Sequence, residues 1–156
     1  MNASHESAGN RSGNHSKIKR LAAGMVGMGM IFDETYRPFF ESVSRRPLYD
    51  PAFGVCNVEL AAVASRTGGR AERYKKASGS AFTSHTEPDA VGKMLADTTL
   101  DFVCVATPDD RHFEAARAVL ASGKHLLVEK PSVLTLAEVD ILDRLAREQL
   151  VRGDLD

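Results

Sequence analysis

Apolar runs of strand length alternate along this chain with segments whose apolar residues have helical spacing. The strand-like runs are nearly unbroken, which is typical of strands covered on both faces, and they lie at residues 21–26, 57–65, 101–106 and 126–128. A shorter strand is expected around residues 80–83. Strands and helices that alternate in this way predict an α/β fold with a doubly wound, mostly parallel sheet and helices on both faces.

Helices are expected at residues 68–77, at 109–122 and after Thr135. Two of the predicted helix starts carry capping-box patterns, in which a threonine is followed three residues later by an acidic residue. Thr86 with Asp89 predicts one start, and Thr135 with Glu138 predicts the other. Capping boxes satisfy free amides in the first turn of a helix, so they mark where the strand-helix connections end.

The chain divides into three predicted parts. Residues 1–17 are rich in Ser, Asn, Gly and His and are expected to form a disordered tail. Residues 18–149 carry the strand-helix alternation of one domain, and residues 150–156 are expected to form a short polar ending. Within the domain, residues 44–56 form an unusually long connector that is a candidate insertion.

Charge and composition exclude several functional classes. The 20 basic and 21 acidic residues give a net charge of −1 without long blocks of one sign, so neither nucleic acid nor a membrane surface is an expected partner. Residues 1–16 contain no apolar run that could serve as a signal peptide or a membrane span. Cys56 and Cys104 form no disulfide framework or metal set, which predicts a reducing compartment and therefore a cytoplasmic protein.

Two glycines one residue apart, Gly27 and Gly29, follow the first strand. This spacing allows a tight turn and brings bare backbone, including that of Met30 and Ile31, against a pyrophosphate at a helix N-terminus. Phe32 stands where a third small residue is usual, so its ring is expected to crowd the packing of helix on strand. An ordinary tight turn without a ligand is the alternative interpretation.

A second candidate feature is the Glu129-Lys130-Pro131 step at the end of the strand-like run 126–128. In open α/β sheets, ligands bind just beyond the carboxyl ends of the strands, so these polar groups are predicted to face a crevice. An exposed lysine that merely follows a strand is the alternative, because lysine is mostly a surface residue.

Four motifs in order resemble the glucose-fructose oxidoreductase and inositol dehydrogenase family, also called Gfo/Idh/MocA. They are Gly27-Met28-Gly29, Ala64-Ser65-Arg66, the run from Ala106 to His112 and the run from Gly123 to Pro131. The resemblance covers about residues 18–149. It implies a Rossmann domain that binds a nicotinamide cofactor and an oxidoreductase that moves a hydride to or from a sugar, cyclitol or related carbonyl or hydroxyl compound.

The resemblance also implies roles for individual residues. Thr107, Pro108 and Asp109 would lie along the nicotinamide ribose, although Asp109 replaces the commoner Asn and so loses an amide donor. Lys130 would be the catalytic lysine near the substrate hydroxyl, and Glu129 would orient it or contact the cofactor. His112 is a further candidate cofactor contact, with a hydrogen bond to the preceding turn as the alternative.

The end of the second strand predicts the choice of cofactor. An acidic side chain there would accept hydrogen bonds from the adenosine ribose of NAD, but this chain has Ser65-Arg66, with Arg70 close by in sequence. A hydroxyl and a guanidinium favour a 2′-phosphate, so NADP is predicted over NAD. Arg66 in solvent or stacked on adenine is the alternative.

Members of the family continue into a second domain that binds substrate and mediates oligomers, and no such domain follows in this sequence. Three interpretations follow: the dinucleotide-binding part of an oxidoreductase that is catalytically incomplete alone, a stand-alone dinucleotide-binding or regulatory module, and a scaffold whose glycine turn is empty. A small-molecule substrate and an oligomer are expected only of a complete protein with the second domain.

Overall fold

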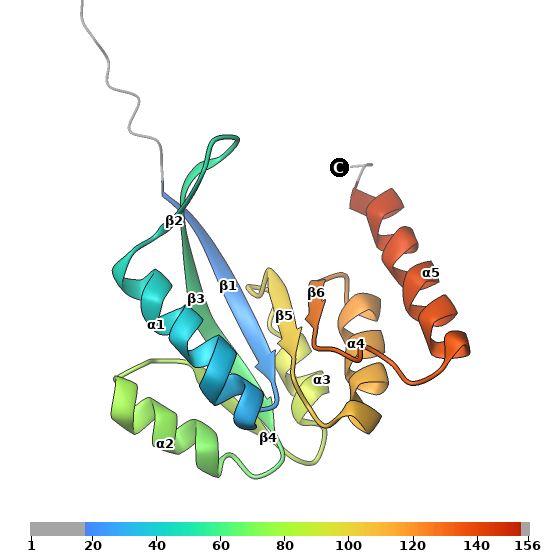
Figure 1. The fold of residues 1–156 in the computed structure, drawn as a ribbon, viewed down its shortest axis with the longest axis horizontal. Helices are drawn as coiled ribbons and strands as arrows, with labels where there is room; N and C mark the ends of the chain where they lie inside the picture. Colours follow the sequence, from blue (N-terminus) through green and yellow to red (C-terminus); the bar gives the residue numbers. More distant parts are fainter. Residues whose placement is uncertain (1–17, 154–156) are drawn as a thin grey trace, which may run out of the picture.

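The computed structural model describes residues 18–153 as a sheet with helices on both faces (Figure 1). Five strands run parallel in the order β4 (Thr83–Thr86), β3 (Gly54–Ser65), β1 (Lys19–Val26), β5 (Phe102–Val105) and β6 (His125–Val128). A sixth strand, β2 (Leu48–Asp50), pairs antiparallel with the start of β3. The predicted doubly wound, mostly parallel fold is therefore confirmed.

The helices divide the hydrophobic core into two layers. The first helix, formed by η1 (Phe32–Tyr36) and α1 (Arg37–Arg45), covers one face of the sheet together with α2 (Gly69–Ser78). The other face is covered by α3 (Ala90–Leu95) and α4 (His112–Ala121), which follows the 3-10 turn η2 (Asp109–Arg111), and α5 (Leu136–Gly153) packs beside α4. None of the helices within residues 18–153 has the length and apolar character needed to cross a membrane.

Successive side chains of a strand point to opposite faces of the sheet, and this divides the apolar residues between the two core layers. In β1, Met25 faces the first helix and α2, whereas its neighbour Val26 faces α3 and α4. The register of β1 with β3 skips Ala61, which forms a β-bulge. Because of this bulge, Ala61 and Ala62 both belong to the α3–α4 side, and Val63 returns to the other face.

The first helix contains a π-helical segment directly before Pro38. The Arg37 amide donates to the Phe32 carbonyl five residues back, and Pro38 then brings no amide hydrogen of its own. Phe32 begins this segment and is only 1% exposed, with its ring centroid 5.2 Å from that of Tyr74 in an edge-on contact. The expected crowding does not occur, since the ring fills the space between the first helix and α2.

The predicted third strand and the helix after it were misplaced. The strand occupies Thr83–Thr86 instead of residues 80–83, and Thr86 pairs with Ser65 as its last residue. Thr86 therefore does not cap α3. The N-cap is Asp89, whose carboxylate accepts a 3.1 Å hydrogen bond from the Gly92 amide. The capping box of Thr135 and Glu138 is confirmed, with each backbone amide donating to the other side chain.

Three further predicted segments are the connector, the polar ending and the tail. The connector at residues 44–56 contains the hairpin of β2 with the first residues of β3, at the end of the sheet opposite the strands' carboxyl ends (Figure 1). The last helix, α5, continues past Gln149 to Gly153, where a polar ending was predicted. The predicted tail, residues 1–17, lies outside the described residues.

Candidate functional site

The carboxyl ends of four neighbouring strands meet at one edge of the sheet. Val26, Val105 and Val128 are in register across β1, β5 and β6. Three backbone hydrogen bonds of 2.9 Å continue the ladder beyond the strands, from Gly27 to Ala64, from Ala106 to Val26 and from Glu129 to Val105. The glycine turn and the Glu129-Lys130 step therefore follow strands that end at the same edge, as the sequence predicted.

A cleft of about 860 Å³ opens at this edge. Small and apolar side chains contribute to its wall, among them Val26, Ala64, Ala106 and Ala115. Eight of the predicted site residues line it: Gly27, Gly29, Met30, Ile31, Ser65, Arg66, Thr107 and Pro108. Four others lie outside the lining: Asp109, His112, Glu129 and Lys130.

Glycine is the one residue type that fits position 27. Its φ is +92°, and a Cβ atom there would lie 2.5 Å from the Ala106 carbonyl oxygen. Gly29 differs, because a Cβ atom there would meet nothing within 4 Å and would project into open space. The helix that starts at Met30 leaves its first amides without helical partners, so this bare backbone can receive an anion such as a diphosphate.

Arginine side chains lie on the β3 side of the cleft. Ser65 Oγ accepts a 3.2 Å hydrogen bond from the Gly68 amide and so shapes the turn into α2. Arg70, in the first turn of α2, donates to the Gly29 carbonyl at 3.3 Å and forms an ion pair with Asp33. Arg66 is exposed and forms no ion pair within residues 18–153. A phosphate that reached this side of the cleft would meet a guanidinium with free donors.

The turn after β5 supplies the cleft with Thr107 and Pro108. Thr107 Oγ1 is buried and has no hydrogen-bond partner among the described residues. A buried hydroxyl without a partner is unfavourable in a native protein, and a polar ligand in the cleft could supply one. Asp109 begins η2 with an exposed side chain. The Gly27 turn and the bare backbone that follows it fit the phosphate groups of a dinucleotide along the cleft.

His112 is buried behind that turn. Its ring is 1% exposed, and its two nitrogens lie 2.7 Å from the Thr107 carbonyl oxygen and 2.7 Å from the Pro131 carbonyl oxygen. The contact with Thr107 is the hydrogen bond to the preceding turn that the sequence left open as the alternative. Both ring nitrogens therefore have partners within the protein. The imidazole lies behind the cleft wall and is not part of its lining.

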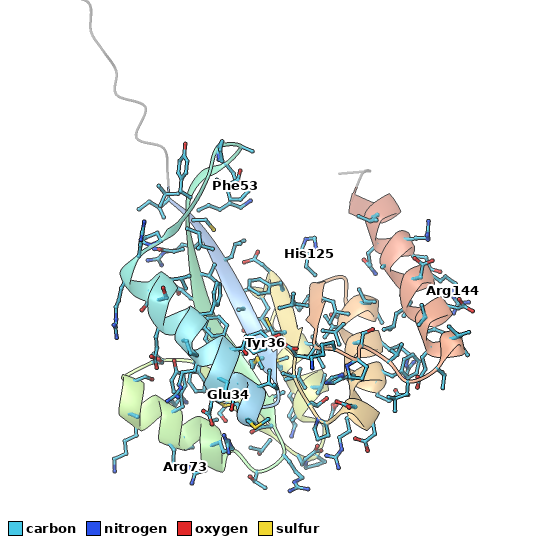
Figure 2. All side chains as sticks on the ribbon, viewed as in Figure 1. Glu34, Tyr36, Phe53, Arg73, His125 and Arg144 are labelled. Atoms are coloured by element: carbon cyan, nitrogen blue, oxygen red, sulfur yellow. The ribbon has the colours of Figure 1, made fainter. Side chains whose placement is uncertain are left out.

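Glu129 is held by Tyr36, a residue that belongs to none of the sequence motifs. The Tyr36 hydroxyl donates a 2.8 Å hydrogen bond to Glu129 Oε1. Burial, and next this hydrogen bond, raise the pKa of Tyr36 above its ordinary value. Burial also raises the pKa of the Cys104 thiol to about 12, with a smaller contribution from the Glu129 charge. Figure 2 shows Tyr36 over the middle of the sheet and Phe53 far from it, at the tip of the hairpin.

Lys130 is exposed at the same edge of the sheet. Its ammonium group forms no hydrogen bond or ion pair within residues 18–153. The neighbouring Glu129 carboxylate is occupied by Tyr36, so the two adjacent charges of this step are not paired with each other. A free ammonium at this edge of the sheet is chemically able to hydrogen-bond an oxygen of a bound molecule and to stabilise negative charge on it.

Comparison with known proteins identifies the family. The family model GFO_IDH_MocA, described as an oxidoreductase family with an NAD-binding Rossmann fold, matches residues 21–153. D-xylose 1-dehydrogenase (NADP(+)) of Hypocrea jecorina is 34% identical over 90 residues, which are 57% of this chain and 23% of that protein. The scyllo-inositol 2-dehydrogenase (NADP(+)) IolW of Bacillus subtilis is 35% identical over 78 residues, which are 43% of this chain and 22% of that protein.

A solved structure gives the same result. KijD10, a 3-ketoreductase from Actinomadura kijaniata in complex with TDP-benzene and NADP, superimposes with a TM-score of 0.66 at 26% identity, over 84% of this chain and 36% of that one. The matches thus span about a quarter to a third of the relatives' lengths. The chain belongs to the Gfo/Idh/MocA oxidoreductase family, and residues 21–153 form its NAD-binding Rossmann domain.

Proposed function

We propose that this chain binds NADP(H), in preference to NAD(H), in the cleft at the carboxyl edge of the sheet. The observation that carries the proposal is the Gly27 turn, where only a glycine fits against Ala106 and the next glycine leaves bare backbone open to the cleft. Arg66, exposed and without an ion pair among residues 18–153, supports the preference for a 2′-phosphate. The NADP named with two relatives and bound in KijD10 agrees with this preference.

The proposed reaction is a hydride transfer between the cofactor and a hydroxyl or carbonyl compound. The nicotinamide ring would supply or accept the hydride. Thr107 and Pro108 would support the nicotinamide half through the Thr107 hydroxyl and the turn backbone. In carbonyl reduction the Lys130 ammonium would hydrogen-bond the reacting oxygen and give it a proton as the hydride arrives; in oxidation the neutral Lys130 amine would accept the hydroxyl proton as the hydride leaves. Glu129, fixed by Tyr36, would support the loop that carries Lys130.

The proposed substrate class is a sugar, a cyclitol or a related polyhydroxylated compound. It rests on the activities named for two relatives, a D-xylose dehydrogenase and a scyllo-inositol dehydrogenase. Because the matches span about a quarter of those proteins, the activity is a proposal for a whole protein in which a further domain holds the substrate. Oligomers formed through such a domain stay a prediction.

The free, buried Cys56 and Cys104 support a reducing, cytoplasmic location.

A stand-alone dinucleotide-binding module is the second candidate, favoured by the position of Lys130 outside the cleft lining. The variant Lys130→Ala separates the two candidates. If Lys130 acts on the substrate, the variant of an active protein loses turnover by orders of magnitude and keeps its cofactor affinity. An unchanged turnover would remove the catalytic role of Lys130, whereas a protein that binds the cofactor without any turnover would favour the binding module.

Titration with NADPH, followed by its fluorescence, tests the proposal. Gly29→Val is the informative variant, because its side chain enters open space in the cleft without a steric conflict inside the protein. We expect saturable binding by the wild-type chain and little or no binding by Gly29→Val, with unchanged thermal unfolding. Gly79→Ala, at the far end of α2, is the control and should bind like the wild type. A wild-type chain with no saturable signal would overturn the proposal.

A further inference from the structure

His112 is buried, with 1% of the residue exposed, although its ring carries two polar nitrogens. It comes from the first turn of α4, yet its two hydrogen bonds leave that helix in different directions. One ring nitrogen meets the Thr107 carbonyl oxygen, in the turn after β5, and the other meets the Pro131 carbonyl oxygen, in the loop after β6, each at 2.7 Å. A buried polar group with two short contacts to two separate loops calls for an explanation beyond core packing.

The sheet itself does not join these two loops. The strands β5 and β6 pair as far as Val105 and Val128, and the Glu129 amide makes the last backbone hydrogen bond between them. Beyond that point, no backbone hydrogen bond within residues 18–153 connects residues 106–111 to residues 130–135. The hydrogen bonds that cross from one described loop to the other pass through the His112 ring.

We propose that His112 is a positioning residue that fixes the distance between the nicotinamide-side turn and the loop of Lys130. This inference rests on the proposed function. The Thr107 carbonyl belongs to a residue of the cleft wall, and the Pro131 carbonyl belongs to the residue after Lys130. A shift of either carbonyl therefore moves a group that faces the nicotinamide half of the cofactor. Small displacements at such sites have large effects on binding and rate.

The chemistry of imidazole suits this bridge. Both partners are carbonyl oxygens, which only accept hydrogen bonds, so a neutral ring donates to one of them and keeps the other in contact, and only a ring with hydrogen on both nitrogens donates to both. Glutamine has a single terminal amide nitrogen in place of two separated ring nitrogens, and phenylalanine keeps the ring volume without any donor. These two replacements separate the loss of the bridge from the loss of a packed ring.

The test compares two ligands that share the adenosine and 2′-phosphate groups. NADPH contains the nicotinamide half, and 2′,5′-ADP does not. Only the NADPH affinity should depend on the bridge. We expect His112→Gln and His112→Phe to weaken NADPH binding about tenfold, since neither side chain places a polar nitrogen against each of the two loop carbonyls, while 2′,5′-ADP binds as before.

Val119→Ala provides the matched control for stability. Val119 is fully buried on the same helix and touches neither loop carbonyl through a hydrogen bond, so its loss should lower the unfolding temperature without changing the ratio of the two affinities. If both affinities fall together in the His112 variants, or if the ratio stays at the wild-type value, His112 only stabilises the fold and the inference is wrong. Absence of NADPH binding by the wild type would instead refute the proposed function.

Discussion

The Tyr36 hydroxyl donates a 2.8 Å hydrogen bond to the Glu129 carboxylate and so joins the first helix to the end of β6. The two residues come from opposite ends of the domain sequence, and their contact crosses the carboxyl edge of the sheet. The carboxylate next to Lys130 is thereby held by a neutral donor instead of by the lysine. This contact connects the architecture of the sheet to the placement of the proposed catalytic group.

Replacement of this tyrosine should change how stability depends on pH. The pKa of Tyr36 is raised in the folded protein, so the folded state keeps a proton that the unfolded state loses above about pH 10. The stability from the hydrogen bond is therefore fully present below that pH and is lost as the pH rises through the folded-state pKa. Tyr36→Phe should lower the free energy of unfolding by about 1–2 kcal/mol at pH 8.

Urea unfolding of the two proteins from pH 8 to pH 11 measures both effects. The difference in unfolding free energy between wild type and Tyr36→Phe should shrink as the pH rises above about 10. A difference that stays constant across this range would show that the pKa of Tyr36 is not raised in the folded protein.

The sequence carries a signal for Tyr36 in the spacing of its aromatic residues. Phe32, Tyr36 and Phe40 are spaced by four residues, and all three are buried. A tyrosine on a buried helical stripe needs a partner for its hydroxyl, and partners are carboxylates or carbonyls at a strand end. The partner itself could not be found from local sequence, because Glu129 is separated from Tyr36 by most of the domain.

The strands and the glycine turn were predictable because their signals are local. Buried parallel strands have continuous apolar runs, and Gly27 must be glycine where the chain turns against Ala106. The strand β4 was misplaced because its sequence, Thr-Ser-His-Thr, is polar and is held mainly by pairing with β3. The bridge made by His112 was also out of reach, since it depends on where two loops lie in space.

Cys104 should be unreactive in the folded protein. It is 2% exposed, and burial raises the pKa of its thiol to about 12, so little thiolate forms at neutral pH. We expect a disulfide reagent at pH 8 to modify Cys104 at the rate of unfolding, and urea to accelerate the reaction. Mass spectrometry of the tryptic peptides identifies the modified residue. Rapid, complete modification without denaturant would contradict the buried position in β5.

Gly27→Ala should lower the free energy of unfolding by more than the cost of the positive φ alone. The positive φ costs about 1–2 kcal/mol for any residue with a Cβ, and the contact with the Ala106 carbonyl adds to it. Gly79→Ala is the matched control, with a φ of +70° and no atom within 4 Å of the added Cβ. Chemical denaturation should show a clearly larger loss for Gly27→Ala. Equal losses would mean that the close approach to Ala106 is not present in solution.

Arg66→Ala should change the preference between the two cofactors. Removal of a guanidinium from a 2′-phosphate weakens NADPH binding by about tenfold, whereas NADH has no such phosphate and should bind almost as before. Arg73→Ala, on the exposed face of α2, is the control for a general loss of positive charge. Isothermal titration of the wild type and both variants with each cofactor gives the dissociation constants. A parallel loss of NADH and NADPH affinity would indicate stacking on adenine and would remove the assignment.

The most direct test of the account is a crystal structure of the chain with NADPH. The account predicts that the diphosphate lies against the backbone of Gly29 to Ile31 and that the nicotinamide ring lies beside Thr107, on the side of Lys130. Density for the diphosphate away from the glycine turn, or a nicotinamide ring directed toward β4, would contradict it.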